Sequence, residues 1–185
     1  ESYRYFSGKT IDYADNDPTA LPARDITAEL NGAYISPFSY ACQQAYIIYM
    51  TDGEPTIDIN ASARIEAEIG KTCDGSGNGK CLDDLAGHMY EKDLYAARDG
   101  TQRVVTYTIG FQTTQALLQS TADKGHGKYY VANNAAQLVS AFQAAFADIL
   151  SINTSFAAPA VSVNAFNKLF NLSDVYFALF KPEST

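Results

Sequence analysis

The fold is decided by residues 45–55, which read AYIIYMTDGEP. The first part of this stretch, residues 45–50, is a continuous run of apolar and β-prone side chains, and the Asp-Gly pair that follows ends it abruptly. A strand that is apolar on both faces is typical of a parallel sheet, because helices cover both faces of such a sheet. We therefore expect residues 45–50 to form an interior strand of a parallel sheet.

Segments with strand and helix patterns alternate on the C-terminal side of this run. Further strands are expected at residues 103–109 and 127–132, and helices at residues 60–70, 82–97, 115–122 and 134–150. This order produces βαβ units, which have right-handed crossovers and place helices on the faces of the sheet. The predicted fold class is α/β, with an open and mostly parallel sheet flanked by helices.

The character of the sequence changes at both ends of this alternating region. Residues 1–33 are rich in Asp, Asn and Pro, which indicates a loop-rich insertion or the end of a preceding helix. Residues 34–150 carry the α/β pattern. Residues 151–185 show strand-like runs at 158–163 and 175–180 around an Asn-rich turn, so we interpret them as a β connector toward a following domain.

Composition and charge exclude several classes of function. The chain has 185 residues with a net charge of -8, and 46% of its residues are hydrophobic, which is typical of one globular domain. The acidic balance argues against nucleic-acid binding, since phosphate contacts need clustered Lys and Arg. No apolar run approaches the roughly 20 residues that span a bilayer. Because the sequence opens with neither Met nor a signal peptide, we expect it to be a piece of a longer protein.

The cysteines predict a short disulfide. Cys73 and Cys81 stand at the two ends of a Gly-rich loop, which brings its ends together at little entropic cost. Metal binding is the alternative, but His88 and His126 are isolated in the sequence and offer no paired ligands. A disulfide implies an oxidising compartment. Cys42 is then left over, with a partner expected outside this sequence.

Asp52 is the first candidate for a metal ligand. It follows the strand at residues 45–50, and ligands of open α/β sheets bind beyond the carboxyl ends of the strands. Its carboxylate is a hard oxygen donor that suits Mg²⁺ or Ca²⁺. The alternative is an ordinary turn in which Asp52 caps the next segment. The position of this residue alone does not decide between the two.

The Gly-rich loop is a second candidate for cation binding. Oxygen donors stand at alternate positions of the loop, with Gly at the sixth, as at the start of a calcium loop: Asp74, Ser76 and Asn78. The twelfth position is Leu85 rather than Glu, although Asp83 and Asp84 could partly substitute. Because the bidentate ligand is missing, we favour a disulfide-closed surface turn, followed by a helix whose first turn is acidic.

Motifs for catalysis and phosphate binding are missing from the sequence. There is no Gly-x-Ser-x-Gly elbow, no neighbouring nucleophile for His88 or His126, and no phosphate-binding loop. We therefore expect a protein that is not an enzyme.

The strand that ends in Thr-Asp-Gly resembles the fourth strand of the von Willebrand factor A domain. Residues 104–111 resemble the fifth strand of that domain, and residues 127–150 resemble its sixth strand and last helix. The adhesion site of that family combines an Asp-x-Ser-x-Ser loop, a Thr and the Asp after the fourth strand. Asp52 matches only the last of these pieces, so the resemblance implies an incomplete domain, the C-terminal part.

A narrower resemblance links the chain to the PilY-type tip adhesins and assembly factors of type IV pili. Four blocks carry it in order: residues 34–56, 75–86, 155–167 and 176–182. The resemblance implies adhesion and pilus assembly at the cell surface or outside the cell, with an outer-membrane association. It also implies minor pilin-like subunits and a host or surface receptor as partners, and a divalent cation (Mg²⁺ or Ca²⁺) at Asp52. The alternative is a von Willebrand A-like interaction module of another secreted or cytosolic complex.

Overall fold

A computed structural model describes residues 1–13, 23–152, 156–159 and 177–180 of the protein. The chain divides into two compact units, Glu1–Phe142 and Gln143–Thr185. The first unit holds the main sheet and the candidate site.

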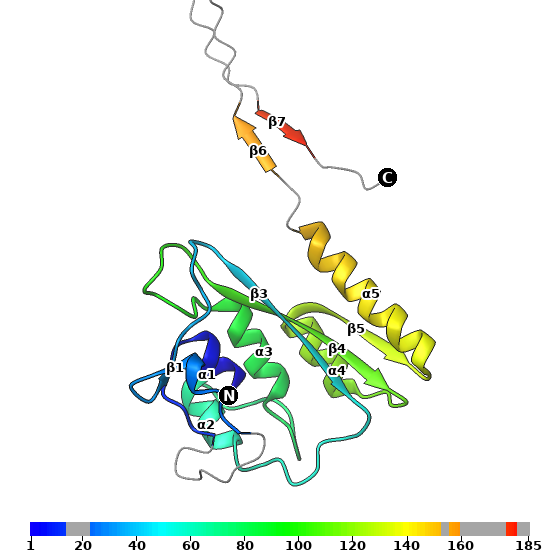
Figure 1. Ribbon diagram of the computed structural model, residues 1–185. Helices are drawn as coiled ribbons and strands as arrows, with labels where there is room; N and C mark the ends of the chain where they lie inside the picture. Colours follow the sequence, from blue (N-terminus) through cyan, green and yellow to red (C-terminus); the bar gives the residue numbers. More distant parts are fainter. Residues whose placement is uncertain (14–22, 153–155, 160–176, 181–185) are drawn as a thin grey trace, which may run out of the picture. The chain divides into compact units, whose positions relative to one another are not determined.

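The core of the first unit is a three-stranded parallel sheet in the order β3-β4-β5 (Figure 1). Its strands are β3 (Gln44–Thr51), β4 (Arg103–Phe111) and β5 (His126–Ala132). β3 runs parallel to β4, and β4 runs parallel to β5. The predicted α/β class with a parallel sheet flanked by helices is therefore confirmed.

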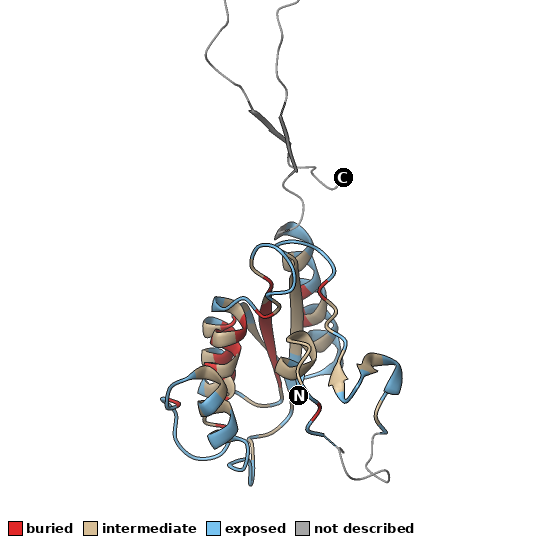
Figure 2. Cartoon of the chain, turned by 90° about the vertical axis from the view of Figure 1, so that its left-hand side faces the viewer, coloured by how far each residue is buried: buried red, intermediate tan, exposed pale blue. Residues whose placement is uncertain are grey.

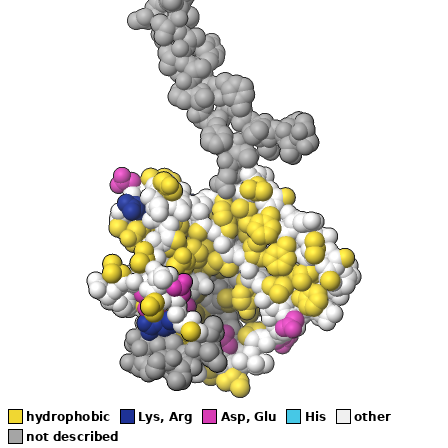
Figure 3. All heavy atoms as spheres, viewed as in Figure 1, with side chains coloured by type: hydrophobic (Ala, Val, Ile, Leu, Met, Phe, Trp, Pro, Cys, Tyr) yellow, Lys and Arg dark blue, Asp and Glu magenta, His cyan; other side chains and the backbone are white. Residues whose placement is uncertain are grey.

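The predicted interior position of the strand at residues 45–50 is wrong within the described residues. Among the described strands, β3 is an edge strand that pairs only with β4, and its residues Tyr49 and Met50 are 41% and 47% exposed. β4 is the central strand, and residues 104–110 are all buried (Figure 2). An apolar run in a strand indicates that other elements cover both faces of the sheet there. It does not indicate whether the strand has a neighbouring strand on each side. Hydrophobic side chains also gather on the face where β3 lies, among few charged groups (Figure 3).

Helices cover both faces of β4. Val104 packs with Phe38 and with Met89, a residue of α3 (Leu82–Glu91). The Thr108 hydroxyl donates a hydrogen bond of 2.8 Å to the Leu118 carbonyl in α4 (Ala116–Lys124). Ile109 packs with Ala141 from α5 (Ala135–Ile152). Because alternate residues of a strand face opposite sides, α3 and α4 lie on one face and the beginning of α5 on the other.

Helix boundaries agree with the predictions except at α3. That helix ends at Glu91 rather than near residue 97, because Lys92 has an extended backbone. α2 spans Ser62–Ile69 and ends at Gly70, whose φ of 71° is the left-handed conformation common after a helix.

The N-terminal residues contain more regular structure than a loop-rich segment. They form α1 (Ser2–Phe6), the short helix η1 (Ile26–Ala28) and a hairpin of β1 (Glu29–Leu30) and β2 (Ala33–Tyr34). The hairpin turns through Asn31 and Gly32, which both have positive φ, as a tight two-residue turn requires.

The second unit contains an antiparallel pair of strands, β6 (Phe156–Pro159) and β7 (Phe177–Phe180). The turn predicted between them lies outside the described residues. Among the helices that the structure describes, none is long and apolar enough to cross a membrane.

Candidate cation and partner site at the carboxyl edge of the sheet

A cleft lies where β3 ends and where the chain that follows β4 enters α4. It has a volume of about 590 Å³, and an adjoining pocket has a volume of about 210 Å³. The two hollows share four lining residues: Glu54, Pro55, Gln115 and Leu117. Carboxylate, hydroxyl and amide side chains line much of the larger hollow: Glu54, Ser76, Asn78, Asp83, Thr114, Gln115 and Ser120. The cleft is therefore suited to a polar ligand or to a protein surface.

Asp52 lines the smaller pocket and is exposed. The turn after β3 is closed by Thr51, whose hydroxyl donates to the Gly53 carbonyl at 3.0 Å and lies 3.3 Å from the Gly53 amide. Asp52 is thus not needed to satisfy this turn. Within the described part of the chain, its carboxylate has neither an ion pair nor a hydrogen bond, so it is free to contact a ligand.

The predicted disulfide between Cys73 and Cys81 is confirmed. The two Cα atoms are 5.3 Å apart, and both cysteines are buried. The loop that the bond closes forms one wall of the cleft, through Gly75, Ser76 and Asn78. Cys42 is exposed and forms no disulfide among the described residues.

The disulfide loop is bonded to the segment that follows β3. The Asn78 carboxamide oxygen accepts a hydrogen bond from the Asp58 amide at 3.1 Å, and the Gly79 amide donates to the Asp58 carbonyl at 2.9 Å. Gly79 has a φ of +70°, and a Cβ atom there would lie 2.8 Å from Pro55 Cγ. Only glycine allows this close approach without strain, so the wall of the cleft lies directly against the Asp52 turn.

Three carboxylates come together behind this wall. Asp74, Asp83 and Asp84 offer oxygen atoms that all lie within 4.8 Å of one another, and the last two are buried in the first turn of α3. Acidic residues cluster here in a way that could hold a metal ion, because carboxylate oxygens are the ligands of hard divalent cations.

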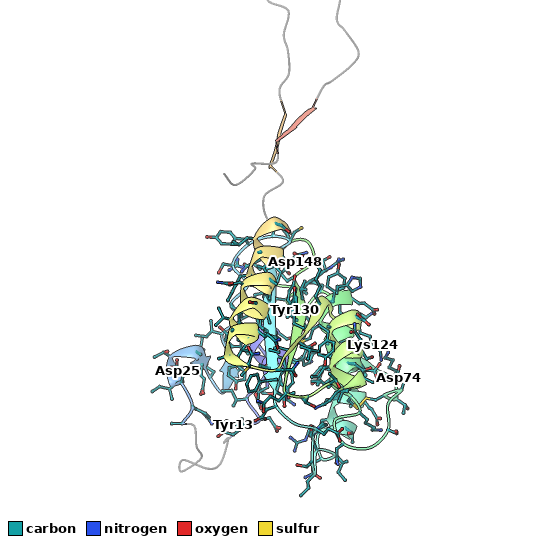
Figure 4. All side chains as sticks on the ribbon, turned by 90° about the vertical axis from the view of Figure 1, so that its right-hand side faces the viewer. Tyr13, Asp25, Asp74, Lys124, Tyr130 and Asp148 are labelled. Carbon is teal, nitrogen blue, oxygen red and sulfur yellow. A yellow bond between two sulfur atoms is a disulfide. The ribbon has the colours of Figure 1, made fainter. Side chains whose placement is uncertain are left out.

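The centre of this cluster is contacted by an ammonium group. Lys124, the last residue of α4, places its Nζ 2.8 Å from Asp74 Oδ2, 2.8 Å from Asp83 Oδ2 and 3.2 Å from Asp84 Oδ1. Figure 4 shows Lys124 and Asp74 side by side. Lys71 adds a second ammonium, 3.0 Å from Asp84 Oδ1. The charge that a metal ion would supply is therefore already supplied in large part by lysine.

The pKa values of the cluster follow from these contacts. Burial acts to raise the pKa of Asp84, but the Asp74 amide and the two ammonium groups outweigh it and lower the pKa to about 2. Burial acts to lower the pKa of Lys124, and its hydrogen bonds to the three carboxylates raise it instead. Both groups are thus charged at neutral pH.

The cluster should make stability depend on acid pH. Because the pKa of Asp84 is lowered on folding, its contribution to the free energy of unfolding is complete above about pH 4 and is lost as the pH falls toward about 2. We expect Asp84→Asn to lower the free energy of unfolding at pH 6 and to have a clearly smaller effect at pH 2.5, where part of the contribution is already lost, measured by urea denaturation. An equal effect at both pH values would contradict this assignment.

A second group of potential ligands does not form a metal site. Glu66, Cys73 and Cys81 lie together. The two sulfurs are bonded to each other, whereas a metal ligand must be a free thiolate. The Glu66 carboxylate also pairs with Lys80 at 2.8 Å.

The structure separates the two predicted cation sites. Asp52 belongs to neither group of clustered ligands among the described residues. Asp74 lies with Asp83 and Asp84, the two residues that were expected to replace the missing bidentate ligand of the loop. The Asn78 side-chain oxygen instead accepts a hydrogen bond from the Asp58 amide. Lys124 could not be predicted as part of this cluster, because it is 50 residues from Asp74 and no spacing rule connects the two.

The two histidines lie away from the cleft. His126 begins β5, so it lies at the amino edge of the sheet, where its ring stacks on Tyr90 at 3.7 Å. His88 is on α3, and its ring makes a T-shaped contact with the Tyr3 ring at 5.5 Å between centroids. Neither imidazole lines the cleft.

Comparison of the chain with protein-family models, with curated proteins and with solved structures finds no match.

Proposed function

We propose that this chain is a non-enzymatic interaction module that binds a protein partner in the cleft at the carboxyl edge of its sheet. The observation that carries the proposal is the cleft with its adjoining pocket: the disulfide loop lines the cleft, and Asp52 lines the pocket with an exposed carboxylate that has no ion pair within the described residues. Ligands of open α/β sheets bind at this edge. A polar lining of this kind suits the polar groups of a protein surface.

The setting that we propose is the tip of a type IV pilus, in adhesion and pilus assembly. It is supported by the resemblance to the PilY-type family, which implies minor pilin-like subunits and a host or surface receptor as partners. The buried disulfide also supports a location outside the cytosol, because such bonds persist in oxidising compartments. This observation favours the pilus over the alternative of a cytosolic interaction module.

A divalent cation at Asp52 forms part of the proposal. The described residues around Asp52 do not make a complete ligand set. A cation there would need oxygen donors from outside the described ranges and an acidic group from the partner. Asp52 would contribute one carboxylate oxygen, and an exposed side chain at the rim of the pocket is able to do so.

The test is Asp52→Asn in the full-length protein, with Mg²⁺ and Ca²⁺ titrated by calorimetry. We expect the affinity for the cation to fall by about tenfold or more, because Asn keeps the shape and removes the charge. Asp99→Asn is the matched control, since Asp99 is exposed and precedes β4 at the opposite edge of the sheet. Equal cation affinity in the wild type and in Asp52→Asn would contradict the cation role.

A further inference from the structure

The carboxylate cluster joins three parts of the chain. Asp74 belongs to the disulfide loop, Asp83 and Asp84 begin α3, and Lys124 ends α4. The Lys124 ammonium contacts all three carboxylates at 2.8 to 3.2 Å. These contacts link the loop to both helices through one nitrogen atom.

The cluster also reaches the cleft. Asp83 accepts a hydrogen bond from the Ser120 hydroxyl at 2.6 Å, and both residues line the larger hollow. Asp74 directly precedes Gly75, which lines the same hollow. The Asp74 amide donates to Asp84 at 3.0 Å, so backbone and side chain of Asp74 are both held. Whatever holds Asp74 therefore positions this wall of the cleft.

An ammonium group and a divalent cation cannot share this cluster. Ca²⁺ takes oxygen ligands at about 2.3–2.6 Å, and it would have to occupy the space between the carboxylates in which Lys124 Nζ lies. The side chain of Asp84 is fully buried and that of Asp83 is 7% exposed, so these carboxylates need positive charge among them, and Lys124 already supplies it from this position.

We infer that Lys124 is the built-in cation of this cluster: it occupies the position that a metal ion would take, and it holds the disulfide loop in place as a wall of the cleft. Lys124 is thus a positioning residue for the cleft. The inference deepens the proposed function, because the cleft is the proposed binding surface. It also distinguishes the two predicted cation sites, because Lys124 occupies the one at the loop and makes no contact with Asp52 among the described residues.

Lys71 provides a matched comparison within the same cluster. Its ammonium contacts Asp84 alone, at 3.0 Å, and its side chain is 61% exposed, against 31% for Lys124. Removing the Lys71 charge deletes one ion pair and leaves Lys124 in contact with all three carboxylates. Removing the Lys124 charge leaves the contacts among three carboxylates repulsive.

The experiment measures hydrogen exchange of residues 74–80 in the full chain, with and without Ca²⁺. All proteins carry Asp52→Asn, so that cation binding at Asp52 does not affect the measured exchange. The proposed cation role of Asp52 is tested separately, by the calorimetry described above. We expect Lys124→Met to exchange about tenfold faster in this loop, and Ca²⁺ to restore slow exchange by taking the vacated position. The parent protein and Lys71→Met should exchange slowly and be indifferent to Ca²⁺.

Three results would overturn the inference. The first is Ca²⁺ binding to the parent protein that Asp84→Asn abolishes, because the cluster would then be a metal site. The second is unchanged loop exchange in Lys124→Met. The third result concerns Lys124→Arg, which keeps the positive charge and is used if Lys124→Met does not fold. Fast exchange of the loop in Lys124→Arg would show that the charge does not hold the loop.

Discussion

Replacing Gly127 by Ala is expected to lower the free energy of unfolding by about 3 kcal/mol, as overpacking against a rigid neighbour does. A Cβ atom at Gly127 would lie 2.2 Å from the Thr106 carbonyl oxygen and 2.7 Å from its carbon. These atoms belong to the backbone of β4, which cannot rotate aside. The contact lies beside the register shift between Thr106 and Thr108, where β5 begins to pair with β4. The substitution would therefore push two strands of the core sheet apart.

Gly53→Ala is the matched control for this experiment. Nothing lies within 4 Å of a Cβ atom at Gly53, and its φ is not positive. We expect a change within about 0.5 kcal/mol in urea denaturation, or a slight stabilisation from the smaller entropy of the unfolded chain. Equal effects of the two substitutions would show that the close approach of β4 and β5 at Gly127 is not as described.

Loss of the disulfide is the second large effect. We expect the double variant Cys73→Ser and Cys81→Ser to lose about 2–3 kcal/mol of stability, because a short closed loop restricts the unfolded chain by roughly this amount. For a protein of this size, the melting temperature should fall by roughly 4–12 °C. The wall of the cleft should also loosen, because the loop then keeps only noncovalent contacts among the described residues, which include its bonds to Asp58, Glu66 and Asp84 and the ion pair between Asp74 and Lys124.

Cys42→Ser is the control for the disulfide experiment. Cys42 is exposed and forms no disulfide among the described residues, so its loss should change the melting temperature by no more than about 2 °C. If the double variant melted at the wild-type temperature under oxidising conditions, the disulfide would have no role in stability. If Cys42→Ser had the larger effect, Cys42 would be the cysteine that matters for the fold.

The strands and helices of the first unit could be predicted because their signals are local. The apolar run at residues 45–50 and the similar run at residues 103–109 each report that helices cover them, and the alternation with helices makes the sheet parallel. The hairpin at residues 29–34 was missed, because strands of two residues carry no periodicity. The edge position of β3 was also missed, since an apolar strand looks the same in the middle of a sheet and at its edge.

The site divides in the same way. The sequence by itself determined that Asp52 lies at the carboxyl end of a strand, because an Asp-Gly pair directly follows an apolar run, and that Cys73 can reach Cys81, because a short Gly-rich loop joins them. Only the tertiary structure decided that Lys124 fills the carboxylate cluster. That contact depends on the packing of α3 against α4, which brings together groups 50 residues apart, and the attraction between opposite charges depends on their distance in space and not along the chain.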